Sequence, residues 1–300
     1  MTDLSNHTAL ITGSARGIGK AIALRYASLG ANIALNYAHD EDAAAATASQ
    51  IERYGVDVVA IKADICRPNE VERLFTETMR RFGKIDIVVA NAGVEIIDQP
   101  LLDATEEQFD RLFAINTKGA FFTLQKAAQH VADNGRIISI GSSTTVLPAA
   151  GVGLYGASKM AARYVVGVLA LELGQRGITV NTIIPTSIDG AGVYTDMTDD
   201  DPFRQLMTTV RPLGGRMGRP EDVADAAEYF AGELAGWSAG NTCSSPEEPT
   251  SNRCRHGEHK TISWQLGQAR HSRLGRAVAY LYVDQPTGES CSRALRRFIG

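Results

Sequence analysis

Three glycines in the segment TGSARGIG, residues 12–19, constrain the fold of this chain more than any other feature. The segment follows an apolar stretch typical of a strand and leads into KAIALRYASLG, which has a helical pattern. Gly13 would allow a sharp turn, Gly17 would let the backbone approach a pyrophosphate, and Gly19 would let helix and strand pack closely. The helix N-terminus would face the phosphates. The segment predicts a dinucleotide-binding turn; a glycine-rich surface turn without a ligand is the alternative. We assign cofactor contacts here to Gly13, Ser14, Arg16, Gly17, Ile18 and Gly19.

Up to about residue 242, short β-branched runs alternate with longer amphipathic segments rich in Ala and Leu. This alternation is typical of repeated βαβ units and predicts an α/β fold with a doubly wound parallel sheet, the Rossmann fold. A chain of 300 residues can bury such a core as a single domain. The expected strands lie near 7–12, 31–36, 56–61, 85–90, 135–141 and 177–184. The expected helices cover about 17–29, 41–54, 69–82, 105–131, 154–175 and 220–235.

The chain changes character after residue 242. Residues 243–300 hold three of the four cysteines and nine Lys or Arg against five Asp or Glu, although the whole chain carries a net charge of -4. Helical and strand periodicity both fade there, so the segment lacks a patterned apolar face that would offset the entropy of ordering the chain. We therefore expect a dinucleotide-binding domain over 1–242 and a separate, poorly ordered tail over 243–300.

Composition and charge exclude several classes of function. The net charge of -4 and the lack of a basic stripe studded with aromatic residues argue against a nucleic-acid partner. No apolar run reaches the roughly 18 residues that span a bilayer, and the N-terminus MTDLSNHTAL has no signal-like pattern, so we expect a cytoplasmic protein without membrane contact. The cysteines lack zinc-ligand spacing. Cys254, His256 and His259 have no second ligand pair, and we expect no metal site.

The end of the second expected strand determines which nicotinamide cofactor fits. A carboxylate there hydrogen-bonds a free ribose 2′-hydroxyl but repels a 2′-phosphate. The strand ends with Asn36, Tyr37 and Ala38, which we assign to cofactor binding and none of which is acidic. Arg16 in the glycine turn offers a cation for the phosphate. The sequence therefore favours NADP, with NAD as the alternative because acids follow at 40–41.

Tyr155 and Lys159 are four residues apart within a helical pattern, so both project from one face of the helix. A phenol with an ordinary pKa of about 10 exchanges protons poorly at neutral pH unless a cation favours its phenolate. Lys159 can supply that charge. The pair alone is a weak signal, because a Tyr and a Lys at this spacing also occur by chance, and its weight comes from the surrounding motifs.

Further motifs flank this pair. Ser142 lies 13 residues before Tyr155 at the end of an expected strand, Asn91-Ala92-Gly93 closes another strand, and INTKG lies between them at 115–119. Together with TGSARGIG and YGASK, these motifs resemble the short-chain dehydrogenase/reductase family, including members similar to 3-oxoacyl-(acyl-carrier-protein) reductases, over residues 7–242. The resemblance implies that hydride transfer interconverts an alcohol and a ketone or aldehyde on a small-molecule substrate.

The resemblance also implies a role for each residue of the site. Tyr155 would be the general acid/base, Lys159 would bind the nicotinamide ribose and lower the pKa of the tyrosine, and Ser142 would hold the substrate carbonyl oxygen. Asn116 would hold the proton-relay water. Ser143 is the rival of Ser142, and Asn116 alternatively caps or braces a helix.

More cofactor contacts are implied after the third, fourth and sixth strands. Asp64 would contact the adenine, although it alternatively caps a helix. After Pro185 the family usually has Gly where this chain has Thr186, and Thr where it has Gly190, which weakens the contacts beside the nicotinamide. Ile188 can still bind the carboxamide through its backbone. The implied contacts are Asp64, Ile65, Asn91, Ala92, Gly93, Pro185 and Ile188.

Residues 186–215 lie where the family places its substrate lid. Apolar side chains in this stretch would line a substrate pocket; alternatively, they only dock the lid on the core. These side chains are Val193, Tyr194, Phe203, Leu206 and Met207.

The family's final strand, usually an apolar run ending in Gly-Gly, is missing after residue 242. Synonymous codons for CSSPEEPTS, read one base earlier, give Leu-Leu-Leu-Thr-Gly-Gly-Ala-Asn and a stop. We hypothesise that a single-base deletion near codon 242 replaced the strand with the tail. Resequencing codons 235–255 tests this, and an intact frame would contradict it.

The family's tetramer pairs the helices near 105–131 and 154–175 and also uses the last strand, so we expect a homo-oligomer, dimer or tetramer, with a weakened contact.

Two functions therefore stand at this point. The leading one is an NADP-dependent reductase of a carbonyl compound, and the alternative is a catalytically silent, NADP-binding regulatory protein, to which the altered tail and Thr186 lend weight. The intact set of Tyr155, Lys159 and Ser142 favours the enzyme over the silent protein. A third possibility, a purely structural or interaction protein, would have no reason to hold these polar groups in register.

Overall fold

The structure is a computed structural model that describes residues 2–210, 215–244 and 281–282. Its sheet has the order β3-β2-β1-β4-β5-β6-β7-β8. All neighbours from β3 to β7 are parallel, and the chain reverses its direction across the sheet between β1 and β4. This confirms the doubly wound fold. The strands are β1 (Thr8–Ile11), β2 (Asn32–Tyr37), β3 (Val58–Lys62), β4 (Ile87–Ala90), β5 (Arg136–Ile140), β6 (Thr179–Ile184), β7 (Thr242–Ser244) and β8 (Leu281–Tyr282).

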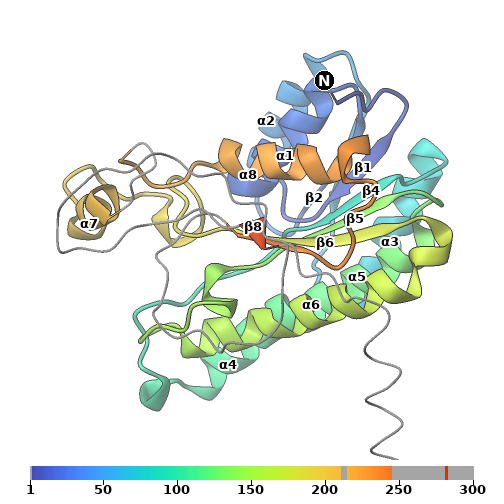
Figure 1. The fold of residues 1–300 in the computed structure, drawn as a ribbon. Helices are drawn as coiled ribbons and strands as arrows, with labels where there is room; N and C mark the ends of the chain where they lie inside the picture. Colours follow the sequence, from blue (N-terminus) through green and yellow to red (C-terminus); the bar gives the residue numbers. More distant parts are fainter. Residues whose placement is uncertain (1, 211–214, 245–280, 283–300) are drawn as a thin grey trace, which may run out of the picture.

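Helices cover both faces of the sheet (Figure 1). One face carries α1 (Gly17–Ser28), α2 (Glu41–Glu52) and α8 (Pro220–Ala231). The other carries α3 (Pro68–Phe82), α4 (Glu106–Leu112), α5 (Ala120–His130) and α6 (Gly153–Glu172), whereas α7 (Pro202–Val210) projects to one side. Short 3₁₀ helices span Leu101–Asp103, Ser143–Thr145, Gly174–Arg176, Gly192–Tyr194 and Glu233–Ala235.

The neighbouring strands β1 and β4, where the strand order reverses, are buried along their whole length. Successive side chains of a strand point to opposite faces, so each strand packs side chains against both helical layers. Ile11 and Val89 pack with α1 and α8, whereas Leu10 and Val88 pack with α3, α5 and α6. This double burial explains why the strands read as continuous apolar runs rather than as an alternating pattern.

The helix expected over 105–131 is divided into three parts. A π-helix, Phe113–Gly119, separates α4 from α5. Its wider turn places the buried Asn116 against α6, where its amide donates to Ser158 Oγ at 2.9 Å, and Thr117 Oγ1 donates to the carbonyl of Ser158 at 2.8 Å. π-Helical turns of this kind commonly mark functional sites. The apolar period of the sequence continues through this segment, so it does not reveal the break.

The expected absence of the last strand is corrected. Thr242–Ser244 forms β7, which pairs in parallel with β6, and β8 pairs with β7 in the antiparallel sense. A sheet ladder uses backbone groups, so the unusual side chains do not prevent three residues from taking this place. The proposed boundary between 242 and 243 therefore falls inside a strand. Most of the segment 243–300, with Cys254, His256 and His259, lies outside the described residues.

Helix α1 can approach β1 and the segment after β4 because Gly19 has no side chain. A Cβ atom at Gly19 would lie 2.5 Å from Asn91 Nδ2 and 2.5 Å from the carbonyl oxygen of Gly13. Neither neighbour can withdraw easily, since one is backbone and the other is held by two hydrogen bonds. The close helix–strand packing expected for Gly19 is thereby confirmed.

We expect Gly19→Ala to lower the free energy of unfolding by roughly 1–3 kcal/mol, the usual cost of overpacking a tight contact. Gly167→Ala is the matched control, because Gly167 lies within α6 and a Cβ there meets nothing within 4 Å. That control should gain up to about 1 kcal/mol from helix propensity. Urea unfolding followed by circular dichroism measures both changes. Equal effects of the two substitutions would contradict the packing argument.

Candidate functional site

A cleft of about 700 Å³ opens at the carboxyl ends of the central strands. Ligands of open α/β sheets bind at this position, where the strand order reverses. Apart from Ser14 and Asn116, every residue that the sequence assigned to the cofactor or to catalysis lines this cleft. The tertiary structure thus brings together groups that lie more than a hundred residues apart in the chain.

The glycine turn adopts the backbone that its sequence predicts. Gly13 has φ +62° and Gly17 has φ +56°, a region that favours glycine. Arg16, the N-cap of α1, makes no capping hydrogen bond with its side chain. By contrast, Asp40 caps α2 and Thr105 caps α4 through their side chains. The first N–H groups of α1 therefore lack a side-chain cap at the cleft, and this end of the helix fits an anionic pyrophosphate.

Two assigned residues have their side chains inside the fold. Ser14 is fully buried, its Oγ donates to the carbonyl of Ile11 at 2.8 Å, and it accepts from the N–H of Asn36 at 3.2 Å. Its assignment as a cofactor contact is corrected: it joins β1 to β2 beneath the turn. Asn36 accepts from the N–H of Gly13 at 3.1 Å and donates to the carbonyl of Ala63 at 3.0 Å. Asn36 thus fixes the turn with its side chain, although it also lines the cleft.

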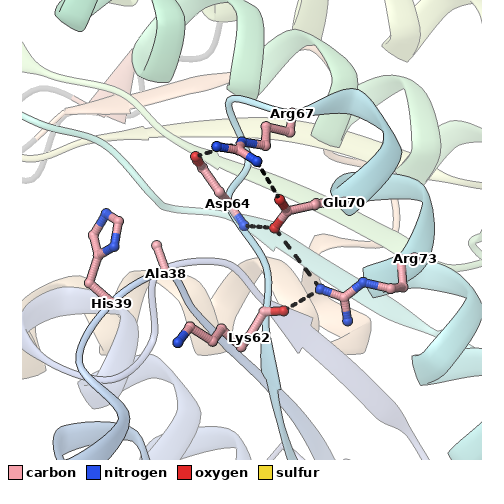
Figure 2. A pocket seen from close by; sticks show the side chains of 7 residues that line it. All are labelled: Ala38, His39, Lys62, Asp64, Arg67, Glu70 and Arg73. Atoms are coloured by element: carbon pink, nitrogen blue, oxygen red, sulfur yellow. Dashed lines mark hydrogen bonds and ion pairs between the residues drawn. The ribbon is translucent and has the colours of Figure 1, made fainter.

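Beyond the end of β2, the cleft adjoins a second, shallower pocket (Figure 2). Its arginines are neutralised: Arg67 pairs with Asp64 at 3.7 Å, and Arg73 pairs with Glu70 at 4.0 Å. Figure 2 shows the side chain of Lys62 on the side of the pocket away from this cluster. The carboxylate of Asp64 also accepts from the N–H of Cys66 at 2.9 Å, before the helix begins. The N-cap of α3 is Arg67, so Asp64 is not a helix cap, and it lines the cleft.

Three basic side chains at this end of the cleft have no acidic partner among the described residues. They are Arg16, His39 and Lys62, and all three are exposed. The sequence reasoning missed His39 and Lys62. The signal was present, because His39 lies two residues after β2 and Lys62 ends β3, and ligand contacts gather at strand ends.

Tyr155 and Lys159 lie on one face of α6, as their spacing predicts, and both are buried at the cleft. Lys159 Nζ donates to the carbonyl of Ile140 at 3.2 Å. A Cβ at Gly93 would lie 2.8 Å from this nitrogen, so the glycine of the Asn-Ala-Gly segment gives the ammonium group its room. The first turns of α6 therefore place a phenol and an amine side by side at the carboxyl end of β5.

Ser142 follows β5 and caps the short helix Ser143–Thr145. Its Oγ accepts hydrogen bonds from Thr144 N at 3.3 Å and Thr144 Oγ1 at 3.0 Å. The hydroxyl also faces Tyr155, and its hydrogen bond works to lower the pKa of that phenol. Ser143 does not line the cleft. Between the two rivals, the geometry favours Ser142.

The charges of this pair are set by burial. Burial raises the pKa of Tyr155 above its ordinary value, and the neighbouring carboxylate of Glu95 adds to the shift. Burial lowers the pKa of Lys159 to about 8, although Glu95 opposes the change. The resemblance implied a lowered pKa for Tyr155. In this state the direction is the opposite, because desolvation and Glu95 outweigh the hydrogen bond from Ser142.

Asn116 lies beneath the cleft and does not line it. Its Nδ2 donates to the carbonyl of Val94 at 2.8 Å and to Ser158 Oγ at 2.9 Å, and its Oδ1 accepts from the N–H of Val94 at 2.9 Å. Both amide hydrogens are therefore used. This bracing role is one of the two readings that the sequence left open.

The expected lid contributes only part of its apolar side chains to the cleft. Val193 and Tyr194 line it, while Phe203 lies behind and stacks on Tyr194 with ring centroids 5.4 Å apart. Leu206, on α7, is 53% exposed and, like Met207, does not line the cleft. The pocket-lining prediction thus holds for two of the five side chains.

The backbone near Ile188 is well anchored. Asp189 N donates to the carbonyl of Gly218 at 2.8 Å, and Gly218 N donates to the carbonyl of Ser187 at 3.1 Å. The carbonyl of Pro185 accepts from Ser143 N at 3.0 Å. The segment that would face the nicotinamide is therefore held from two sides, independently of the side chain at Thr186.

The sequence reasoning also missed Glu95, two residues after Gly93. Its Oε1 accepts from Tyr155 Oη at 3.2 Å, and its Oε2 accepts from Val193 N at 3.2 Å. Its place after the end of β4 was the available signal.

Comparison with known proteins agrees with this geometry. A family model described as enoyl-(acyl carrier protein) reductase matches residues 13–245. Versicolorin reductase 1 of Aspergillus parasiticus is 37% identical over 254 residues, which cover 79% of this chain and 94% of that protein. A short-chain dehydrogenase/reductase of Serratia marcescens is 36% identical, with a TM-score of 0.75, covering 80% of this chain and 96% of that one. A short chain dehydrogenase of Burkholderia cenocepacia in complex with NADP is 34% identical, with a TM-score of 0.74 and the same coverage.

A doubly wound sheet, a glycine turn at its switch point and these relatives define a nicotinamide-dependent oxidoreductase. The chain belongs to the short-chain dehydrogenase/reductase family.

Within the described part of the chain, no helix is long and apolar enough to cross a membrane. The same residues contain no group of three or more His, Cys, Asp or Glu side chains arranged to hold a metal ion.

The lowered pKa of Lys159 predicts a pH-dependent stability difference for Lys159→Met. The amine has a pKa of about 8 in the folded protein and about 10.4 in the unfolded chain. Below pH 8 both states carry the charge, and the folded state bears the full cost of burying it. From pH 8 to about pH 10.4 the unfolded chain binds the extra proton, so wild-type stability rises relative to the variant.

We therefore expect Lys159→Met to melt above wild type at pH 7, with a difference that shrinks toward pH 10. Differential scanning fluorimetry without added cofactor measures it. A variant that melts below wild type at pH 7, or a difference independent of pH, would contradict the burial argument.

Proposed function

We propose that this protein is an NADP-dependent reductase that interconverts a ketone or aldehyde and an alcohol. The observation that carries the proposal is the meeting of Ser142, Tyr155 and Lys159 at the carboxyl end of β5, beside a cleft with an uncapped helix N-terminus. A proton donor, an amine and a hydroxyl around one point are what carbonyl reduction requires.

The residues present fit the cofactor. The pyrophosphate would lie at the N-terminus of α1 and the nicotinamide ribose near Lys159, with the carboxamide against the backbone of Ile188. When bound, the cofactor supplies the hydride to the carbonyl carbon.

The chain's own residues then orient the carbonyl group and transfer the proton to its oxygen as charge develops there. Ser142 Oγ donates a hydrogen bond to the carbonyl oxygen and orients it. Tyr155 gives its proton to that oxygen as negative charge grows there. The hydrogen bond from Ser142 favours this transfer, whereas burial and Glu95, which raise the pKa of the phenol, oppose it. Lys159, with a pKa of about 8, can hold or release a proton near neutrality. We assign Asn116 a positioning role, because its amide braces Val94 and Ser158.

Tyr155→Phe tests this mechanism. We expect turnover to fall by roughly 10²–10⁴-fold, because the proton donor is lost, while NADPH binding is retained. Tyr54→Phe is the matched control, since Tyr54 is 52% exposed and does not line the cleft. NADPH oxidation with a panel of ketones and NADPH fluorescence titration give the two readouts. Turnover near the wild-type rate in Tyr155→Phe would overturn the mechanism.

The alternative of a silent cofactor-binding protein has a clear signature in the same panel. Wild-type protein that binds NADPH and reduces none of several classes of carbonyl compound would favour it. The panel should include 3-oxoacyl thioesters, sugars, steroids and aromatic ketones. The names of relatives such as versicolorin reductase 1 make aromatic ketones the first class to try.

We propose NADP rather than NAD because basic side chains without an acidic partner among the described residues gather at the end of β2. Arg16 lines the cleft, His39 lines both pockets, and Lys62 lines the adjoining one. The Asn36 side chain cannot act as a ribose-binding acid, since it is an amide tied to Gly13 and Ala63. A 2′-phosphate could pair with Arg16 and Lys62 there, although Asp40 and Asp64 also line this end of the cleft.

Arg16→Glu should weaken NADPH more than NADH. We expect the KM for NADPH to rise by roughly 10–100-fold, the usual value of a charge-assisted hydrogen bond, and the KM for NADH to change little. Arg53→Glu, at an exposed residue that does not line the cleft, is the control for net charge. An equal change for both cofactors would show that Arg16 does not discriminate between them.

We propose a homo-oligomer, dimer or tetramer, formed through α5 and α6. Their outer faces expose Phe121, Met160, Tyr164 and Leu171, and Tyr164 and Leu171 are each 76% exposed. Light scattering tests this, and a monomer would contradict it.

The division into a domain over 1–242 and a tail over 243–300, the shifted reading frame and the cytoplasmic location stay predictions.

A further inference from the structure

Glu95 fixes a carboxylate beside the hydroxyl group of Tyr155. One oxygen is held by the lid: Oε2 accepts from Val193 N at 3.2 Å, and Gly192 packs so closely that a Cβ there would overlap this oxygen. The other oxygen, Oε1, accepts from Tyr155 Oη at 3.2 Å. Glu95 is therefore anchored on the lid side and presents a hydrogen-bond acceptor at the reacting end of the cleft.

This acceptor conflicts with a simple ketone. A ketone that takes the proton of Tyr155 brings its own oxygen lone pairs next to Glu95 Oε1. Two acceptors without a hydrogen between them repel each other, and the repulsion grows as negative charge develops on the reacting oxygen. The nearby ammonium group of Lys159 interacts electrostatically with Glu95, but its nitrogen donates to the carbonyl of Ile140 and leaves Glu95 Oε1 as an acceptor.

The conflict disappears when the substrate brings its own donor. Oxygens on adjacent carbons lie about one hydrogen-bond length apart, ~2.8 Å, which is close to the 3.2 Å between Tyr155 Oη and Glu95 Oε1. A hydroxyl group on the carbon next to the carbonyl can therefore reach Glu95 while the carbonyl oxygen reaches Tyr155. The same position suits an amino group.

We propose, on the basis of the carbonyl reduction proposed above, that Glu95 determines specificity: it accepts a hydrogen bond from a hydroxyl or amino group next to the substrate carbonyl. The carboxylate equally disfavours substrates that carry a carboxylate or a phosphate at that position. The rest of this wall is flat, because Tyr194 lines the cleft with its ring stacked on Phe203 at an interplanar angle of 5°. Aryl ketones are therefore suitable probes.

The test compares three aryl ketones that differ only beside the carbonyl. They are 2-hydroxyacetophenone, which carries a donor, propiophenone, which carries a methyl group of similar size, and benzoylformate, which carries a carboxylate. Wild-type protein should reduce 2-hydroxyacetophenone with a kcat/KM roughly 10–100-fold above that of propiophenone, the usual value of a hydrogen bond to a charged group. Benzoylformate should be the poorest substrate.

Substitutions at Glu95 should change this order. In Glu95→Ala the ratio between the hydroxyl ketone and propiophenone should fall toward one. In Glu95→Gln, which keeps an acceptor without the charge, benzoylformate should gain most. Glu52→Gln, at an exposed position outside the cleft, is the control and should leave all ratios unchanged. A wild-type protein without preference, or a Glu95→Ala variant that keeps it, would overturn the proposal. NADPH titration checks that each variant still binds the cofactor.

Calorimetric titration of the same ketones into protein saturated with NADP⁺ separates this proposal from the proposed function. If no ketone is reduced but the hydroxyl ketone binds more tightly in a Glu95-dependent way, carbonyl reduction fails and the specificity assignment stands. If ketones are reduced without a Glu95-dependent preference, the specificity assignment fails and the proposed function stands. If the protein shows neither turnover nor preferential binding, both proposals are overturned.

Discussion

The carboxyl ends of β1, β2 and β4 are tied to one another by hydrogen bonds from side chains to backbone, and the cleft depends on this connection. Asn91 Nδ2 donates to the carbonyls of Thr12 and Gly13 at 2.8 and 3.0 Å, and Thr12 Oγ1 accepts from Asn91 N at 3.0 Å. Asn36 accepts from Gly13 N on the other side. Buried polar networks rigidify a fold only when every member is satisfied, as here. The glycine turn is therefore held in place by its neighbours as well as by its own conformation.

Around this connection, three glycines act through the side chain that they lack. Gly13 approaches the backbone of Ala92, Gly19 approaches Asn91, and Gly93 leaves room for the ammonium group of Lys159. A methyl group added at any of these glycines would prevent the close contact. The fold thus brings backbone next to backbone at the point where a nucleotide would lie, and it brings a lysine into a nearly solvent-free position. Burial then lowers the pKa of that lysine to about 8.

The structure gives several polar residues of the predicted motifs a different role from the one that the sequence indicated. Ser14 and Asn116 belong to the site's motifs, but they support it from beneath, because their polar groups are used within the fold. The phenol of Tyr155 has a raised pKa beside Glu95, whereas the motif alone suggested a lowered one. Burial and a carboxylate from another strand end decide this balance, and neither can be read from the spacing of a tyrosine and a lysine.

The sequence by itself determined the parallel fold, the turn at residues 12–19 and the shared helix face of Tyr155 and Lys159, because these follow from local periodicity and glycine conformation. Only the tertiary structure decided the π-helix at Phe113–Gly119, the short β7 strand, and the approach of Glu95 to Tyr155 and Val193. These features arise from contacts between segments far apart in the chain. Such contacts leave no periodic signal, since their geometry depends on how the strand ends meet.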